Sequence, residues 1–386
     1  MRRWVQGALI LPDRIVPNGL LAYEGGRIAG TWDLEEEAAP EHDPRDTWTL
    51  EGGYIAPGYI DLHVHGGGGG DFMDGHPEAV AAITATHAQY GTTGLLATTL
   101  TDSEEAILRA IRAVKAAPRR GSRILGFHVE GPFINPAIKG AQDERFVRPA
   151  SVAEIDRWLA EGSPDDRWHV TLAPEVEGAM AAIRHLASRG AVVSAGHTEC
   201  TYARLEAAAA AGLSHVTHLF NAMRGLHHRE PGTVGGALSL PGLTVEIIAD
   251  GIHVHPAAVA LAVRAGGAGR FMLITDAMRA AGLGEGEYLL GGLRAVVRDG
   301  AVRLEDGTLA GSVLTMERAV QNMVHFAGVD LPTAVSMAAL HPARKHRLDH
   351  RKGSLAPGKD ADLLLLDKDL GVLTTIVEGE VVHDRR

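Results

Sequence analysis

The sequence contains one cysteine, Cys200, so no disulfide can form within the chain. A chain almost free of cysteine fits a reducing compartment, and we expect a cytoplasmic protein. Cys200 follows His197-Thr198-Glu199, where a thiol could act as a ligand or nucleophile. We favour instead a residue at a helix start with no chemical role.

Positive charge in excess and long apolar runs are also missing. The formal net charge is -11 at pH 7, which argues against a nucleic acid or an anionic membrane surface as the main partner. The chain has no apolar run of membrane-spanning length, and its first residues lack the apolar core of a signal peptide. We therefore expect a small-molecule partner, with neither nucleic acid nor membrane.

Both ends of the chain read as short strands. Apolar runs near the N-terminus are separated by Gly25-Gly26, a hairpin signal, and an acidic stretch over Glu35–Asp46 predicts an exposed loop. Two further strand patterns lie at 361–367 and 375–382, the second containing a tight turn. Neither end has enough strands for a stable sheet. We predict one small discontinuous β-sandwich domain over 1–53 and 352–386.

Between the ends, buried strand patterns alternate with amphipathic helices. The strand patterns begin near Tyr59, Gly94, Arg123, Trp168, Val192, His215, Thr244 and Phe271. The helix patterns cover Glu78–Tyr90, Ser103–Ala116, Val152–Ala160, Ala179–Ser188, Tyr202–Ala211 and Ala257–Ala265. Capping boxes are predicted at Thr101 and Ser151, and a hairpin over 288–309 precedes a last helix at 315–326. This alternation predicts an α/β protein with a (β/α)8 TIM-like barrel over 54–351; an open doubly wound sheet is the alternative.

Titratable residues gather where the predicted strands end, which is the face where such barrels place their chemistry. The two-residue spacing of His63 and His65 on an extended segment points both imidazoles to one face. The other strand-end residues are Glu130, His197, His218, His253 and Asp276. Burying such groups without partners costs several kcal/mol, so their repetition at these positions indicates a site.

Ligand chemistry divides these residues by role. Glu130, His197 and His218 form a three-ligand set that leaves a position open for water, as in catalytic sites for Zn²⁺. Fe²⁺, Co²⁺ or Mn²⁺ would also suit this set. Asp276 suits the transfer of the water proton, and His253 suits donation to an oxygen that becomes negative.

His63 and His65 have two interpretations. They can complete a second metal position with Glu130 as the bridge, or they can surround a single metal as polar residues. We expect one metal per subunit and keep the second as an alternative.

Several motifs now carry a resemblance. The segments at 53–66 and 353–363 resemble the opening and closing signatures of the amidohydrolase superfamily. Within it, the N-acetylglucosamine-6-phosphate deacetylase family is similar in an ordered set of motifs, which are His128–Phe133, Gly196–Thr198, Thr217–Met223, Arg229–Gly232, Asp250–His253 and Thr275–Ala277.

This resemblance implies a barrel with a small β-sandwich, a homodimer, and hydrolysis of the acetamide of N-acetyl-D-glucosamine 6-phosphate to acetate and D-glucosamine 6-phosphate. It implies the same roles for the metal ligands, Asp276 and His253. The phosphate would be held by the backbone around Asn221 and Ala222 and by Arg229 of the partner subunit. The sugar would be lined by Ala141, Leu309, Ala310 and Gly311.

Two other functions are weighed against this one. One alternative is another amidohydrolase, acting on a cyclic amide or on a different N-acyl substrate. The hydrolases of cyclic amides generally bridge two metals with a modified lysine, whereas Glu130 occupies that place here. A sugar-phosphate binding protein without activity predicts a missing ligand or proton carrier, but Glu130, His197, His218 and Asp276 are all present. Among the remaining histidines, His346, His350 and His383 lie near charged residues, which predicts a solvated face.

Overall fold

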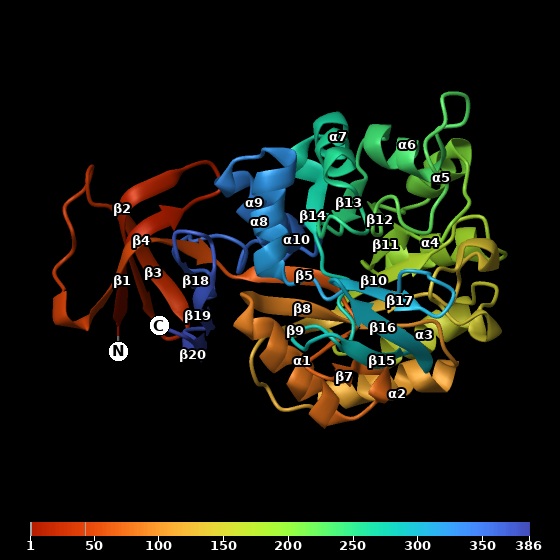
Figure 1. Ribbon diagram of the computed structural model, residues 1–386, viewed down its shortest axis with the longest axis horizontal. Helices are drawn as coiled ribbons and strands as arrows, with labels where there is room; N and C mark the ends of the chain where they lie inside the picture. Colours follow the sequence, from red (N-terminus) through yellow and green to blue (C-terminus); the bar gives the residue numbers. More distant parts are fainter. Residues whose placement is uncertain (1, 43) are drawn as a thin grey trace.

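The computed structural model describes residues 2–42 and 44–386, which form a barrel and a smaller sheet beside it (Figure 1). The barrel strands are parallel and lie in the order β14-β13-β12-β11-β10-β9-β8-β5. Their bounds are β5 Tyr59–Val64, β8 Thr92–Thr99, β9 Arg123–Glu130, β10 Arg167–Leu172, β11 Val192–Ala195, β12 His215–Val216, β13 Thr244–Ile247 and β14 Phe271–Leu273.

Backbone hydrogen bonds between the first strand and the segment after the last one bring the two edges of this sheet together. Asp276 N donates to His63 O over 2.9 Å, and His65 N donates to Ala277 O over 2.9 Å. These bonds connect β5 with the chain just beyond β14. The predicted (β/α)8 barrel is confirmed, and the residues expected at the strand ends meet at one face.

Helices follow most of the barrel strands. The α-helices are α1 Pro77–Gln89, α2 Glu104–Ala116, α3 Val152–Glu161, α4 Ala179–Ser188, α5 Tyr202–Ala210, α6 Gly232–Ser239, α7 Pro256–Gly266, α8 Met316–Ala327, α9 Leu331–Ala338 and α10 Leu340–Lys345. The short 3-10 helices are η1 Pro44–Asp46, η2 Phe72–Asp74, η3 Pro136–Ile138, η4 Glu144–Phe146 and η5 Ala268–Arg270. Our prediction lacks α6, whose glycines have low helix propensity, and it also lacks α9 and α10.

One predicted helix cap is wrong. Ser103, not Thr101, caps α2, because its hydroxyl accepts a hydrogen bond from Ala106 N over 3.2 Å. Ser151 does cap α3 by accepting from Glu154 N over 3.3 Å. The Glu154 carboxylate, however, pairs with Arg148. Within the described part of the chain it does not accept a hydrogen bond from Ser151 N, so the predicted capping box is only half formed.

Both chain ends contribute to the smaller sheet, as predicted, and the N-terminal and C-terminal strands lie side by side in it (Figure 1). Its seven strands are hydrogen-bonded in the order β20-β19-β18-β4-β1-β2-β3. Their bounds are β1 Arg3–Ile10, β2 Ile15–Glu24, β3 Arg27–Asp33, β4 Thr47–Pro57, β18 Leu363–Leu366, β19 Val372–Val377 and β20 Glu380–Asp384. The predicted hairpin turn at Gly25-Gly26 joins β2 to β3. The domain limits 1–53 and 352–386 stay a prediction.

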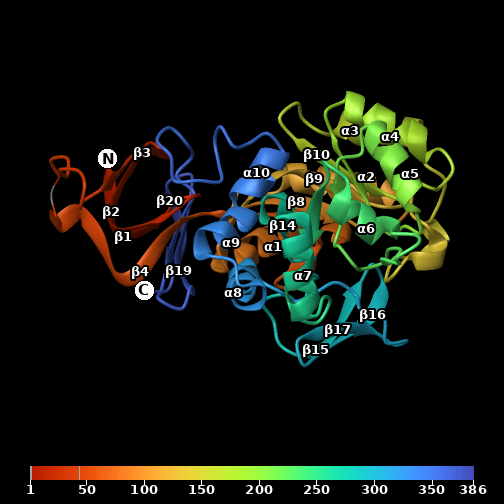
Figure 2. The same cartoon turned by 90° about the horizontal axis from the view of Figure 1, so that it is seen from above.

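The predicted hairpin at 288–309 is instead a three-stranded antiparallel sheet. Its strands are β15 Gly286–Leu290, β16 Leu293–Arg298 and β17 Ala301–Leu304. Figure 2 shows this sheet on the outside of the barrel. Buried Leu290 and Ala295 pack in one apolar cluster with Leu100 and Met278, which follow barrel strands. A two-residue strand at each of Gly66–Gly67 (β6) and Gly70–Asp71 (β7) completes the sheets.

The barrel interior is unusually polar for a buried core. His128, His169 and His215 are fully buried there with Glu246. His346, predicted to be solvated, is also buried at 4% exposure, so that prediction is wrong. It lies at the end of the short α10 and its ring packs 5.5 Å from that of His169, a long-range contact that charged sequence neighbours do not reveal.

The exposed-loop prediction over 35–46 agrees with largely exposed residues at 35–42, whereas residue 43 lies outside the described residues. In the part of the chain that the structure describes, no helix is long and apolar enough to cross a membrane.

Candidate metal centre

Glu130, His197 and His218 converge at the carboxyl ends of β9, β11 and β12. Glu130 Oε1 lies 3.0 Å from Nε2 of each histidine, and the two Nε2 atoms lie 3.2 Å apart. All three residues are buried, with exposures of 2 to 5%. The ligand atoms predicted for the first metal are thus directed at one another.

The backbone at these strand ends adopts an uncommon conformation. The φ angles are 47° at His197, 29° at His218 and 50° at Asp276, all in the left-handed region. Residues with a Cβ atom rarely adopt this region, and such residues concentrate at functional sites. The polar side chain after each of these strands is therefore carried by a residue with left-handed backbone conformation.

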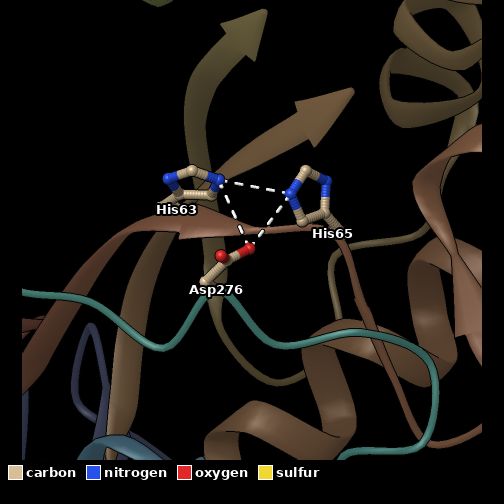
Figure 3. A group of neighbouring side chains, drawn as sticks. All are labelled: His63, His65 and Asp276. Carbon is tan, nitrogen blue, oxygen red and sulfur yellow. Dashed lines mark hydrogen bonds and ion pairs between the residues drawn. The ribbon is translucent and has the colours of Figure 1, made fainter. Parts of the chain in front are cut away.

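His63, His65 and Asp276 form a second group beside the first (Figure 3). The Nε2 atoms of the two histidines lie 3.2 Å apart, and Asp276 Oδ1 lies 3.5 Å from His63 Nε2 and 3.2 Å from His65 Nε2. Glu130 faces this group too, with Oε1 3.4 Å from His63 Nε2 and Oε2 3.2 Å from His65 Nε2. Glu130 therefore lies between the two groups, where a bridging ligand would be.

The charges of these groups show why a cation fits here. Burial lowers the pKa of His65, but hydrogen bonds to Asp276 and Glu130 and their charges outweigh burial and raise the pKa to about 9. Burial raises the pKa of Glu130, yet the charge on His63 and the bonds from His197 and His218 bring it well below its usual range. Buried carboxylates thus require positive charge from protons on imidazole or from a metal. With paired imidazole nitrogens 3.2 Å apart, the donor set fits a first-row divalent metal.

Three neighbouring residues that sequence reasoning missed hold these groups in place. Gln142 donates from Nε2 to Glu130 Oε2 over 2.7 Å, and its own oxygen accepts from Thr101 N over 2.7 Å. Glu246 Oε2 lies 3.3 Å from His63 Nδ1, on the side of the ring opposite Nε2. Such partners fix ring orientation and tautomer of a ligand histidine.

Asp250 is the third such residue, and it orients His253. Its Oδ2 lies 2.6 Å from His253 Nδ1, and its Oδ1 accepts from the backbone N–H groups of Ile252 and His253 over 2.8 Å each. Asp250 belongs to the same sequence motif as His253, but the motif alone predicts no role for it. Because Nδ1 is occupied by Asp250, His253 has Nε2 left for a ligand in the cavity.

A cavity of about 230 Å³ joins these side chains. Its walls include the predicted residues His65, Glu130, Ala141, His197, His218, Asn221, Ala222, His253, Asp276, Leu309 and Gly311. His63 and Ala310 are both fully buried, and neither lines the cavity. Arg229 is exposed, bonds to its neighbour His228 over 2.7 Å, and does not line the cavity of its own chain.

Comparisons with known proteins decide the family. The model of the amidohydrolase family matches residues 54–382. The chain belongs to the amidohydrolase family.

Relatives of this amidohydrolase match nearly its whole length. It is similar to an N-acetylglucosamine-6-phosphate deacetylase of Bacillus subtilis, with 37% identity over 97% of this chain and 95% of the relative. It is also similar to an N-acetylgalactosamine-6-phosphate deacetylase of Escherichia coli O157:H7, with 41% identity over 89% and 92%. A solved N-acetyl-D-glucosamine-6-phosphate deacetylase of Mycobacterium smegmatis, in complex with N-acetyl-D-glucosamine-6-phosphate, has a TM-score of 0.91 and 35% identity, covering 99% of both chains.

The resemblance stated from the sequence is therefore confirmed. Amidohydrolases of this kind are metal-dependent enzymes, and this amidohydrolase has groups of histidine and carboxylate side chains that can bind a metal. Cys200 is buried at 1% exposure, and burial raises the pKa of its thiol. A thiol in that state is a poor nucleophile, in agreement with the prediction that it has no chemical role.

Proposed function

We propose that this amidohydrolase removes the acetyl group of N-acetyl-D-glucosamine 6-phosphate, releasing acetate and D-glucosamine 6-phosphate. The observation that carries the proposal is the convergence of Glu130, His197 and His218 in one cavity with Asp276 and His253. The substrate class is supported by relatives that are named amino-sugar-phosphate deacetylases and that align with nearly the whole chain.

Glu130, His197 and His218 would hold a divalent metal, which we propose to be Zn²⁺, and the bound metal would supply a water that ionises near neutral pH. Asp276 accepts the proton of the attacking water and delivers it to the departing amine nitrogen. His253, oriented by Asp250, donates from Nε2 to the acetyl oxygen as negative charge develops there. His63 and His65, with Asp276 and bridging Glu130, would hold a second metal if two are bound.

We further propose a homodimer in which Arg229 reaches the phosphate in the partner's cavity, where the backbone at Asn221 and Ala222 also holds it. A guanidinium matches phosphate oxygens through two parallel hydrogen bonds. The segment at 225–229 is exposed, and Leu226 keeps 63% of its surface accessible, as expected of residues that pack on a partner. The unpaired cysteine supports a reducing location, which we propose to be the cytoplasm.

The test measures acetate release from N-acetylglucosamine 6-phosphate, from the unphosphorylated sugar, and from N-acetylgalactosamine 6-phosphate. The galactosamine epimer is the second candidate substrate, because a relative of that name is 41% identical. Elemental analysis of the same protein gives its metal and the metal ratio. Turnover restricted to phosphorylated sugars would support the proposal, and no turnover with metal bound would contradict it.

A further inference from the structure

Three buried side chains come together inside the barrel, at a deeper level than the candidate metal centre. They are His169 on β10, His215 on β12 and Glu246 on β13, and each has 0% of its surface exposed. One ligand atom from each residue lies within 4.8 Å of those of the other two. On β12, His215 precedes His218 by three residues, so this group lies nearer the N-terminal ends of the strands.

The polar atoms of this group have no hydrogen-bond partners. Within the part of the chain that the structure describes, His169 Nδ1 and Nε2, His215 Nε2 and Glu246 Oε1 are buried and form no hydrogen bond. Such atoms are costly to bury, and most buried polar atoms in proteins are paired. Their concentration in one place points to a bound species that they hold in common.

Hydrogen bonding determines which nitrogen of His215 carries the proton. Thr244 Oγ1 donates to Ser214 O over 3.2 Å, so it accepts from His215 Nδ1, which lies 2.5 Å away. A proton on Nδ1 leaves a lone pair on Nε2 of the neutral ring. Burial lowers the pKa of His215, which favours this neutral form.

The lone pair of His215 lies beside a carboxylate oxygen. His215 Nε2 and Glu246 Oε1 are 3.3 Å apart, but they are not aligned for a hydrogen bond. Two ligands of a tetrahedral Zn²⁺ ion, each about 2.0 Å from the metal, are about 3.3 Å apart and point at the metal instead of at each other. The pair therefore has the separation and the orientation of two ligands of one metal.

The carboxylate of Glu246 also lacks a basic partner. Its Oε2 lies 3.3 Å from His63 Nδ1 and accepts from His218 N over 3.4 Å. Among the described residues, no lysine or arginine pairs with Glu246. The ammonium of Lys345, whose charge acts on Glu246, donates to Ser214 instead. Buried carboxylates are usually paired or coordinate a metal.

A neighbouring group of the same composition has no free nitrogen to offer from one of its histidines. His63, His128 and Glu246 also have ligand atoms within 4.8 Å of one another. However, His128 Nδ1 lies 3.0 Å from Leu62 O, and its Nε2 lies 2.7 Å from Thr171 Oγ1. Both nitrogens of His128 are therefore engaged, whereas both nitrogens of His169 are free.

We propose that His169, His215 and Glu246 bind a structural Zn²⁺ ion inside the barrel, separate from the candidate metal centre. Two imidazoles and one carboxylate form a donor set that suits zinc. The ion joins β10, β12 and β13, and Glu246 connects it to His63. Because the three side chains are fully buried, the ion enters as the barrel folds and exchanges slowly with solvent. This site does not depend on the proposed reaction.

The test starts from full-length protein produced in zinc-supplemented culture and dialysed against EDTA without denaturant. Elemental analysis is expected to find about one Zn²⁺ per chain after dialysis, released only when guanidinium unfolds the protein. His169→Gln and Glu246→Gln should each lose this ion and have a lower thermal midpoint. His87→Gln is the matched control, because it changes a buried histidine that bonds to Gly66 O outside this group, and it should keep the ion.

A double variant separates this ion from a metal in the candidate metal centre. His197→Gln/His218→Gln removes two ligands of that centre and should keep the EDTA-resistant ion. Loss of the ion in this double variant, with retention in His169→Gln, would overturn the proposal. Absence of EDTA-resistant zinc from the unchanged protein would also overturn it, since the group would then hold water.

Crystals of the unchanged protein provide a measurement that does not depend on whether these variants fold. Anomalous diffraction at the zinc absorption edge is expected to show a peak between His169 and His215, in addition to any peak at the candidate metal centre. A peak at the candidate metal centre alone would contradict the proposal.

Discussion

At the scale of single residues, the site depends on a few side chains whose environments differ sharply. Asp276 faces His65 across 3.2 Å, while Asp250 faces His253 across 2.6 Å. The first carboxylate lines the cavity beside Glu130, where it can reach a substrate. The second accepts three hydrogen bonds from its own segment, one of them from the His253 ring.

Asp276→Asn is expected to reduce turnover by about 10²-fold to 10⁴-fold, because an amide cannot accept and return the water proton. Acetate release measures the loss, and elemental analysis of the same samples checks that the metal content is unchanged. Turnover close to that of the unchanged enzyme, with equal metal, would contradict the proton-transfer role.

Asp250→Asn is expected to lower kcat by about tenfold to 10²-fold with a smaller change in KM, because His253 loses the partner that holds its tautomer and direction. The same substitution in a His253→Ala background is the control. It should have little further effect there if Asp250 acts through the ring. An equal loss in both backgrounds would show a structural role instead.

At the scale of elements, the short helix α10 makes contacts at the N-terminal ends of the barrel strands that its own sequence does not predict. Helix α10 brings Lys345 beneath β12, where its ammonium donates to Ser214 O over 2.6 Å and to Ser214 Oγ over 2.9 Å. The helix has six residues and no side-chain cap. Its position therefore depends on tertiary packing rather than on intrinsic helix stability.

Burial lowers the pKa of Lys345 to about 8, although the Glu246 charge opposes this shift. An unfolded lysine titrates near 10.4, so between about pH 8 and 10.4 the unfolded chain binds more protons and stability rises with pH. The free energy of unfolding of the unchanged protein should therefore rise by roughly 3 kcal/mol across this pH window, relative to that of the Lys345→Met variant. Urea midpoints of both proteins at pH 7.5, 9 and 10.5 measure it, and a constant difference would contradict the burial of a charged amine.

At the scale of the whole molecule, the exposed Arg229 leads to a test of the proposed dimer. Arg229→Gln and Asp276→Asn subunits should each be nearly inactive alone. If Arg229 serves the partner's cavity, a hybrid dimer contains one site with both native residues, and an equal mixture should recover about a quarter of the native activity. Activity that remains at the sum of the two parents, with hybrids demonstrated by mass spectrometry, would place Arg229 in its own subunit's site or outside any site.

The arrangement of the elements was largely determined by sequence patterns. Six barrel strands begin where the apolar runs predict them, because the alternation of apolar residues that favours a strand is local in the sequence. They begin at Tyr59, Arg123, Val192, His215, Thr244 and Phe271. The Glu130, His197 and His218 set was also readable, since parallel strands bring their carboxyl ends to one face. Helix α6 was not predicted, because its glycines have low helix propensity.

Only the tertiary structure decided which side chains meet across the barrel. Gln142 reaches Glu130 from a loop, Glu246 lies under His63 from the seventh strand, and His346 is buried at the base. Local sequence patterns determine the strands, the helices and the strand ends at which the polar residues lie. Partners across the barrel depend on closure and side-chain packing, which bring together residues with no spacing in common.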